Sequence, residues 1–281
     1  MKLAYNSNGW RGHSIETIVE ALSRLGYDAI ELSPQRDQLA PESWTQAEAE
    51  RISRIVANAG LQISNLHAGA HDLLKHDAPH EPSLMSISAT ERAHRLDLNR
   101  RAIDFAAALG TDLVCVTSGR LPNQASVDGS WQRLVDGIAD CLAHAATHNI
   151  RIAVEPEPEL FIRSCVDFLA LYRQLGCPPG LGLNLDIGHA QVIYEDTPAI
   201  IREFAPLLWH VHVEDIAGRA HKHLIPGQGQ IDFHGIGKAL TDIGYIGAAS
   251  VELMDHSAQA ENVARHCMAV LQSWRRSVGA A

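Results

Sequence analysis

The sequence lacks three features that would point to a secreted, membrane or nucleic-acid-binding protein. Its five cysteines are scattered and never stand in a CxxC spacing, which argues against a disulfide framework or a cysteine zinc site. No apolar run is long enough to span a bilayer, and the first residues turn polar without a signal-peptide core. The formal net charge of −10 would repel phosphate backbones. We therefore expect a cytoplasmic protein that binds neither membranes nor nucleic acids.

A dinucleotide-binding glycine motif and a repeat of solenoid period are absent too. No GxGxxG follows the first apolar run, which argues against a Rossmann-type protein. The chain has 281 residues, 46% hydrophobic and 20% charged, which is ordinary for a globular protein with a large core. Since α/β barrels commonly reach this length as one unit, we expect a single domain over residues 1–281.

What the sequence does contain is a regular alternation of short apolar runs, rich in β-branched residues, with longer segments of helical period. Runs that are apolar at nearly every position are typical of a parallel sheet covered on its outer face. Eight such units favour the α/β class, as a single (β/α)8 TIM barrel, over an open sheet. The expected strands are 2–7, 27–33, 61–68, 111–119, 150–157, 181–189, 208–215 and 248–254, and the expected helices include 14–26, 94–110, 131–148 and 258–276.

Two polar stretches stand out, one as a break in this alternation and one within a helical segment. The segment 72–90 follows the third expected strand and is the longest break. Barrel enzymes bind substrate on the face that such loops reach, so we interpret this segment as a lid. The stretch 92–101 begins the next helix, and we expect a solvated helix face for its arginines, Arg92, Arg95, Arg100 and Arg101.

Side chains able to bind a metal stand on the last four expected strands. The fifth strand ends in Glu155, the sixth in Asp186 and the eighth in Glu252, while the seventh carries His212. In a parallel barrel these ends open into one mouth, so we expect the four side chains to converge. Converging carboxylates raise one another's pKa unless a cation lies between them. The oxygen-rich set favours one Mn²⁺, Mg²⁺ or Co²⁺, and Zn²⁺ is compatible with it.

Several motifs occur in the order and spacing of a known family, namely GYDAIEL, NLHAGAH, VEPEPE, LDIGHA, HVHVED, PGQGQIDF and VEL. On these motifs the chain resembles the xylose-isomerase-like TIM-barrel superfamily, which includes sugar-phosphate isomerases and epimerases and an endonuclease-IV-like branch. In its ketose 3-epimerases one divalent metal is held by Glu, Asp, His and Glu. The resemblance assigns these roles to Glu155, Asp186, His212 and Glu252. It also implies a small sugar as substrate, and a homodimer or homotetramer as the assembly.

Other residues are expected to bind the substrate. The histidine of the LDIGHA motif, His189, and Arg219 after the seventh strand resemble substrate-binding residues of the family. We expect His223, in the loop after the seventh strand, to bind substrate oxygens, and His67 on the third strand is a further candidate. Glu157 would face the same side of the fifth strand as the metal ligand there, beside the substrate.

The chemistry follows from such a site. A metal that binds a carbonyl and the neighbouring hydroxyl acidifies the C–H between them and stabilises the resulting enediolate. One carboxylate removes the proton and another returns it, and Glu155 and Glu252 are the expected pair. We therefore expect a metal-dependent isomerase or epimerase that acts on a ketose, a keto-sugar or a related polyol derivative.

Two other functions stay open. A lyase or dehydratase acting on a keto-sugar or cyclic hydroxyketone would form the same enediolate and then expel a β-substituent. A zinc-dependent phosphodiester hydrolase of the endonuclease-IV type would hold further metals, and His189, His221 and His223 correspond to a second metal site in that branch. The fourth strand has Thr117 and Ser118 where that branch carries a histidine, which argues against a complete three-metal cluster.

Overall fold

The computed structural model describes residues 1–69, 73–75 and 77–278. Within these residues, eight parallel strands form a closed barrel in chain order, and β8 pairs with β1. The predicted (β/α)8 barrel is confirmed, and each predicted strand is present in a slightly shorter form. The strands are β1 (Lys2–Asn6), β2 (Ala29–Leu32), β3 (Gln62–His67), β4 (Leu113–Val116), β5 (Arg151–Val154), β6 (Leu181–Asp186), β7 (Leu208–Val213) and β8 (Ala248–Val251).

Helices follow the strands, and all four named in the sequence analysis are confirmed. The first is capped as its sequence suggests, because Ser14 accepts the Thr17 N–H at 3.2 Å and Gly26 ends it with a φ of 86°. The helices are α1 (Ile15–Leu25), α2 (Gln46–Asn58), α3 (Ala89–Leu109), α4 (Val127–Thr147), α5 (Cys165–Gln174), α6 (Ile187–Val192), α7 (Thr197–Glu203), α8 (Phe233–Asp242) and α9 (Ala260–Val278), with short 3-10 turns η1 (Ser7–Trp10), η2 (Pro41–Ser43) and η3 (Met254–Gln259).

The predicted start of α3 at residue 94 is wrong, because the helix begins five residues earlier. Ser88 is its N-cap and accepts the backbone N–H of Glu91 at 3.4 Å. This Ser-x-x-Glu spacing is a start signal for a helix. The helical spacing of apolar residues begins only some residues after this cap. The prediction relied on that spacing and therefore placed the start of the helix too late.

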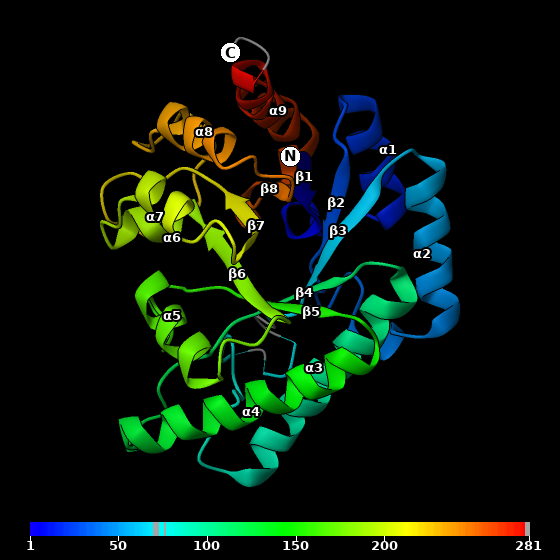
Figure 1. The fold of residues 1–281 in the computed structure, drawn as a ribbon. Coiled ribbons are helices and arrows are strands. Elements are labelled where there is room, and N and C mark those ends of the chain that lie inside the picture. The colour runs from blue at the N-terminus through cyan, green and yellow to red at the C-terminus, as the bar shows by residue number, and fades with distance from the viewer. Residues whose placement is uncertain (70–72, 76, 279–281) are drawn as a thin grey trace. The chain divides into compact units, whose positions relative to one another are not determined.

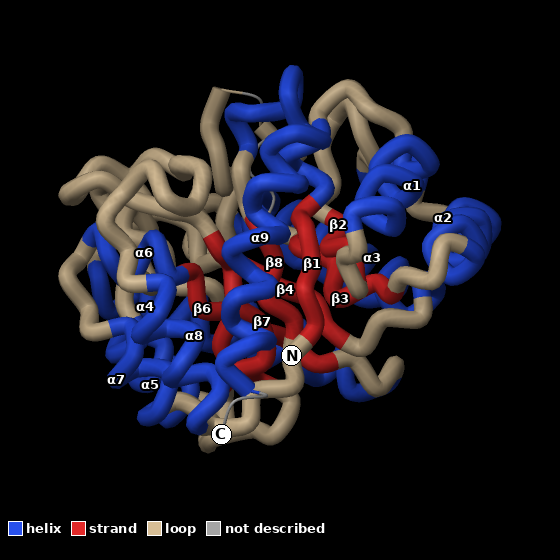
Figure 2. The backbone as a smooth tube through the Cα atoms, turned by 90° about the horizontal axis from the view of Figure 1, so that it is seen from above, coloured by secondary structure: helices blue, strands red, loops and turns tan. Residues whose placement is uncertain are grey.

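The described chain divides into two compact units, of which unit 1 comprises residues 1–32, 54–64 and 183–281. The strand register in unit 1 places side chains of the predicted site at the same height along neighbouring strands. Asp186 of β6 stands opposite His212 of β7, and His212 stands opposite Ser250 of β8. Glu252 follows β8 directly and donates its backbone N–H to Val213 O at 3.0 Å. Helix α9 packs against β1 and β8 in the same unit (Figure 2).

Unit 2 comprises residues 33–53 and 65–182. In it β4 pairs with β3 on one side and with β5 on the other. Helices α3 and α4 lie side by side and pack against these strands (Figure 1).

The expectation of a solvated face for the arginines of 92–101 is wrong for Arg95. Its side chain is buried, with Nε donating to Pro82 O at 2.6 Å and Nη2 to His80 O at 2.8 Å. Burial lowers the pKa of its guanidinium to about 10, although Glu81 acts in the opposite direction. The helical period of the sequence could not reveal that Arg95 is buried, because the loop carbonyl groups that it binds come near it only in the folded chain.

Arg95 therefore ties the described part of the loop after β3 to helix α3. The lid predicted over 72–90 and the single domain predicted over 1–281 stay predictions, and residues 72 and 76 lie outside the described residues. No helix in the described ranges has the length and apolar character needed to cross a membrane.

The packing of α9 on α8 yields a test of the fold. Trp274 of α9 is buried, and its Nε1–H donates to Phe233 O at 2.7 Å. We expect Trp274→Ala to lower the free energy of unfolding by about 3–5 kcal/mol, because it leaves a large cavity. Trp274→Phe keeps most of the packing and should cost about 1–2 kcal/mol. Urea unfolding followed by far-UV circular dichroism measures both.

The matched control is Ile246→Ala, since that side chain is 83% exposed. It should change the stability by less than about 0.5 kcal/mol. If Trp274→Ala cost no more than Ile246→Ala, the α8–α9 contact would not contribute to the fold as described.

Candidate active site

Three strand-end side chains of unit 1 meet as the sequence predicts, and Glu252 is the most firmly held of them. Its Oε1 accepts hydrogen bonds from Asn6 Nδ2 at 3.2 Å and Asn8 Nδ2 at 2.8 Å. Its Oε2 lies 3.1 Å from His212 Nδ1. The two amides come from the end of β1 and the turn η1. They leave Glu252 with one oxygen occupied and the other directed toward His212.

His212 is oriented by a carboxylate that the sequence analysis did not single out. Its Nε2 lies 3.0 Å from Oε1 of Glu31, and both side chains are fully buried. A neutral imidazole that donates from Nε2 to Glu31 has its unprotonated nitrogen, Nδ1, on the other side. That Nδ1 faces Glu252 and also Asp186 Oδ2, which is 3.8 Å away. A ligating histidine held by a carboxylate behind it is a recurrent metal-site arrangement.

Asp186 serves two purposes at the end of β6. Its Oδ1 accepts the backbone N–H groups of Gly188 at 2.7 Å and His189 at 3.1 Å, and so caps α6. Its Oδ2 is buried without a hydrogen-bond partner among the described residues. Leaving a carboxylate oxygen buried and unpaired is costly, so this atom indicates where a ligand or a cation belongs.

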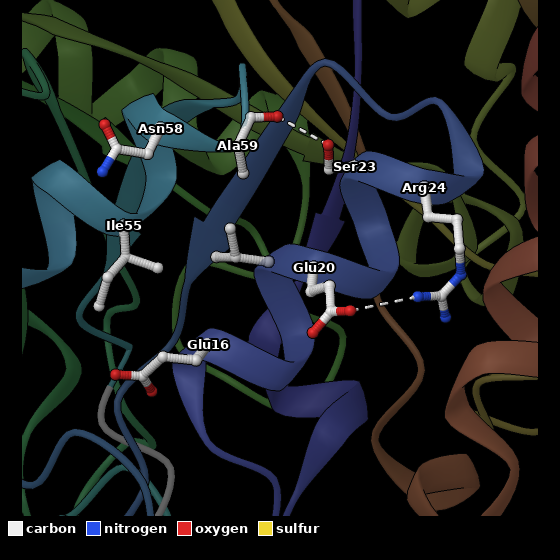
Figure 3. A pocket seen from close by; sticks show the side chains of 8 residues that line it. Glu16, Glu20, Ser23, Arg24, Ile55, Asn58 and Ala59 are labelled. Atoms are coloured by element: carbon white, nitrogen blue, oxygen red, sulfur yellow. Dashed lines mark hydrogen bonds and ion pairs between the residues drawn. The ribbon is translucent and has the colours of Figure 1, made fainter.

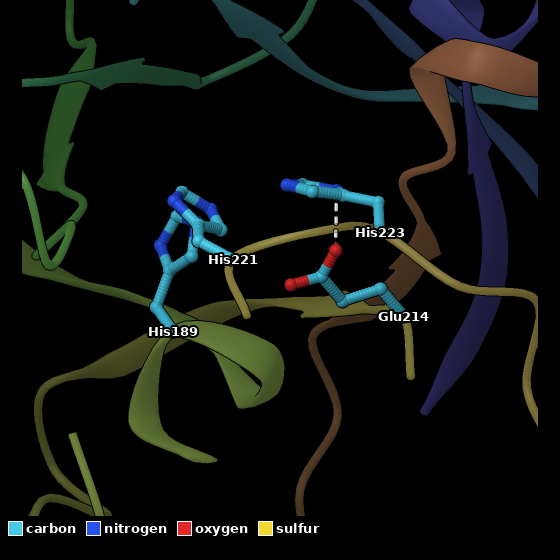
Figure 4. Close-up of side chains that lie close together, drawn as sticks. All are labelled: His189, Glu214, His221 and His223. Atoms are coloured by element: carbon cyan, nitrogen blue, oxygen red, sulfur yellow. Dashed lines mark ion pairs between the residues drawn. The ribbon is translucent and has the colours of Figure 1, made fainter. Parts of the chain in front are cut away.

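A second cluster gathers around Glu214, which follows β7. Figure 4 shows His223, from the loop after β7, over the carboxylate of Glu214, with the rings of His189 of α6 and His221 of the same loop beside each other to one side. The His189 and His221 rings meet edge-on with centroids 4.7 Å apart, and Nδ1 of His223 pairs with Oε2 of Glu214. One ligand atom from each of the four residues lies within 4.8 Å of the others, so the cluster could hold a metal. Gly188 permits this approach, because a Cβ there would collide with Glu214.

Electrostatics in this cluster follow from burial. Burial raises the pKa of Glu214 to about 8, and the nearby Asp186 charge adds to the effect. Burial opposes a charge on His223, but the carboxylates of Glu214, Glu252 and Asp186 outweigh it and raise the pKa of the imidazole well above its usual value. Both shifts make each group hold its proton to higher pH than it would in water.

The neighbouring acid, Asp215, shapes the loop rather than the cluster. Its Oδ1 accepts the N–H groups of Ile216 and Ile231, and its Oδ2 accepts those of Gly227 and Gly229, all at 2.8–3.1 Å. Four backbone donors are thereby satisfied on one buried carboxylate. The segment that carries His221 and His223 is thus closed at its base by Asp215.

Unit 2 contains the predicted residues Glu155, Glu157 and His67. Glu155 follows β5 and is buried, and its Oε2 lies 2.8 Å from Nε2 of His67 at the end of β3. Glu157 lies two residues further on, with Oε1 3.7 Å from Nε2 of His80. Each of these two carboxylates after β5 therefore lies beside a histidine of unit 2.

Unit 1 also has a surface hollow of about 580 Å³ between α1 and α2, shown in Figure 3. Helix residues such as Glu16, Glu20 and Asn58 line it, and Ser23 donates to Ala59 O there at 2.7 Å. Its lining contains none of the strand-end carboxylates, so this hollow is not the candidate site.

With this geometry in place, the chain was compared with known proteins. Residues 19–274 match the family model described as the xylose isomerase-like TIM barrel. The chain belongs to this family. The match covers the strands that carry Glu31, Glu155, Asp186, His212 and Glu252, so the resemblance expected from the motifs is confirmed.

Relatives within the family have sugar-related names. The putative hydroxypyruvate isomerase of Homo sapiens is 26% identical over 270 residues, which cover 92% of this chain and 87% of that protein. The L-ribulose-5-phosphate 3-epimerase UlaE of Shigella flexneri is 22% identical over 247 residues, which cover 86% of this chain and 84% of that protein.

Solved structures agree on the fold. A D-tagatose 3-epimerase-like protein has a TM-score of 0.83 at 20% identity, over 99% of this chain and 98% of the other. The 3-keto-D-glucoside 4-epimerase YcjR from E. coli has a TM-score of 0.77 at 17% identity, over 98% and 99% of the two chains. At these identities the likeness establishes the barrel fold alone.

The structure brings some of the predicted residues of unit 1 together and places one of them elsewhere. Unit 1 brings together Asp186, His212 and Glu252, and separately the histidines of the second cluster. Arg219 lies elsewhere in the unit, with its guanidinium 4.7 Å from the Tyr194 ring centre and Nε donating to Val192 O at 3.3 Å. Its role in binding substrate stays a prediction.

Sequence reasoning missed Glu31 and the pairing of Glu214. The available signal for Glu31 was a lone acid inside the apolar run of β2, since charged side chains are almost never fully buried without a partner. For Glu214 and Asp215 the sequence offered two adjacent acids. Only the tertiary contacts distinguish the one that faces the histidines from the one that closes the loop.

The role of Asp215 can be tested. We expect Asp215→Asn to lower the free energy of unfolding by about 3 kcal/mol, because an amide NH₂ would face backbone donors that need an acceptor. Asp232→Asn is the control, since Asp232 only caps α8 through Gly235 N–H and asparagine caps equally well. Urea unfolding of both variants measures the difference, and equal stabilities would contradict the role given to Asp215.

Proposed function

We propose that this protein is a divalent-metal-dependent isomerase or epimerase acting on a ketose, a keto-sugar or a related polyol derivative. The observation that carries the proposal is the buried set Asp186, His212 and Glu252 in unit 1. Relatives named as a hydroxypyruvate isomerase and a ribulose-phosphate 3-epimerase support the reaction class.

The three residues fit a divalent cation. Asp186 Oδ2 is buried without a hydrogen-bond partner among the described residues, and Nδ1 of His212 faces both carboxylates. The lone pair of an unprotonated imidazole nitrogen is repelled by two neighbouring carboxylates. A proton or a metal ion bound between the three groups removes this repulsion. Carboxylate oxygens with one imidazole suit Mn²⁺, Mg²⁺ or Co²⁺, and also Zn²⁺.

We assign the fourth ligand to Glu155. The assignment is supported by its position directly after β5, the next strand of the closed barrel, and by the family motif in which it lies. His67 holds Oε2 of Glu155 at 2.8 Å, which fixes the direction of this carboxylate within unit 2. His67 is thus a positioning residue for Glu155 as well as a candidate for contact with substrate.

The proton transfers fall to Glu155 and Glu252. A bound divalent cation would supply positive charge that stabilises the enediolate formed from the substrate. Asn6 and Asn8 donate to Oε1 of Glu252 and so fix the direction of this carboxylate. One carboxylate accepts the proton from the carbon next to the carbonyl and the other donates a proton back, to the same carbon or to its neighbour.

The second cluster would bind the polar side of the substrate. Glu214 Oε1 is buried without a hydrogen-bond partner among the described residues, and it suits a sugar hydroxyl. His189 and His223 flank it and would bind further substrate oxygens, and we assign Glu157 and Arg219 to the same task. The cluster also has the donor set for a second cation, and a metal count distinguishes the two roles.

The first test combines metal content with proton exchange. We expect about one divalent metal per chain in the wild type and its loss in Glu252→Gln, since the amide removes a charged ligand. Solvent deuterium should enter the carbon next to the carbonyl of a substrate ketose, and the variant should slow this exchange by about 10²–10⁴-fold. Elemental analysis and NMR of a ketose panel measure the two effects.

The control is Glu203→Gln, an exposed acid at the end of α7 that should keep both metal and exchange. Wild-type protein that holds no metal after reconstitution would overturn the proposal. Two or three zinc ions per chain with phosphodiester cleavage would replace it with a hydrolase. Loss of a β-substituent from the substrate would replace isomerisation with elimination on the same residues.

Glu31 provides a second test. We expect Glu31→Gln to weaken metal binding by about 10–100-fold, the usual effect of altering a partner behind a ligating histidine. The loss should appear in Mn²⁺ titrations followed by electron paramagnetic resonance, with Glu203→Gln again as the control. If the folded Glu31→Gln protein bound Mn²⁺ as tightly as the wild type, metal binding by His212 would not depend on the carboxylate of Glu31.

A further inference from the structure

A third group of metal-ligating side chains lies on the outer helices of unit 2, apart from the strand ends. Nε2 of His144 lies 2.6 Å from Oδ1 of Asp104, and Nε2 of His148 lies 3.1 Å from the same oxygen. Asp104 belongs to α3, His144 belongs to the last turn of α4, and His148 follows that helix. The two imidazole rings are 5.1 Å apart, so both nitrogens point at one spot on the surface.

We propose that Asp104, His144 and His148 form a binding site for a borderline transition-metal cation, with Zn²⁺ as the best fit. His144 and the C-cap residue His148 are four residues apart, the spacing at which two side chains at a helix end can bind one ion together. Two imidazoles and one carboxylate select Zn²⁺, Ni²⁺ or Cu²⁺ over Mg²⁺ and Ca²⁺. The ion would join the end of α4 to α3.

The geometry is close to what zinc requires. Ligand atoms about 2.0–2.1 Å from a tetrahedral zinc stand about 3.3 Å apart. The nitrogens must therefore move away from the carboxylate oxygen by less than an ångström. The side chains can do so, because Asp104 is 51% exposed, His144 28% and His148 37%. Their exposure also leaves room for water as the fourth ligand.

Two features of the surroundings favour a cation. The site lies at the C-terminal end of α4, where the backbone carbonyl groups carry the negative end of the helix dipole. Asp104 also borders a surface hollow of about 180 Å³ beside Trp44 and Phe105, which gives solvent access to its carboxylate. The net charge of the chain, −10, attracts cations generally.

The experiment is zinc counting by equilibrium dialysis after removal of metal with a chelator. We expect His144→Asn/His148→Asn to bind about one zinc ion fewer per chain than the wild type, and Asp104→Asn to bind that ion more weakly. The matched controls are His94→Asn and Asp97→Asn, exposed positions on α3 that should keep the wild-type count. Far-UV circular dichroism verifies that each variant is folded.

A spectroscopic measurement identifies the ligands. The paramagnetic resonance spectrum of bound Cu²⁺, taken as wild type minus the double variant, should show coupling to two nitrogens. An equal zinc count in the double variant and the wild type would overturn the proposal, as would a loss in the controls. Deuterium exchange into substrate should be unchanged in the double variant, so failure of this site and failure of the proposed enzyme function are separate outcomes.

Discussion

The structure of unit 1 depends on one constraint, which is that carboxylates buried at adjacent strand ends must be neutralised or paired. Asp186, Glu252 and Glu31 have almost no contact with solvent, and each has an imidazole or amide group beside it. His212 lies among all three, so its orientation decides which charges are matched. The amides at the end of β1, the short helix α6 and the glycine at 188 can all be understood as means of bringing donors close to these acids. Removing one donor would leave a desolvated charge, which costs more than an ordinary hydrogen bond contributes.

The loop after β7 shows how two adjacent acids divide between structure and chemistry. Asp215 is fully occupied by four backbone N–H groups, and so it is unsuited to bind anything else. Glu214 points toward histidines and keeps a free buried oxygen among the described contacts. A rigid loop base and an unsatisfied side chain next to it together produce a preorganised site. The surface group at Asp104 differs from the buried clusters in this respect. Its exposed side chains can rearrange around an ion, whereas buried side chains are held by their neighbours.

Much of the fold was predictable because parallel strands leave a strong pattern. Apolar runs at regular spacing predicted all eight strands, and the predicted range 14–26 matches α1 with its capping residues. Helix boundaries were less secure, as the early start of α3 at Ser88 shows, since capping and helical period need not begin at the same residue. Arg95 was predicted on the surface, because its spacing on α3 does not reveal the loop carbonyls that hold it inside.

The sequence by itself determined the barrel, the family and the identity of the acids and histidines near the strand ends, because these follow from local pattern and from the order of motifs along the chain. Only the tertiary structure decided which atoms face one another. It placed Glu31 beside Nε2 of His212 and left Oδ2 of Asp186 without a hydrogen-bond partner among the described residues. It also gave Asp215 to the loop and Glu214 to the histidines. Residues that are far apart along the chain carry no mutual signal in one sequence, and their pairing is set by strand register and by the free energy of burying charge.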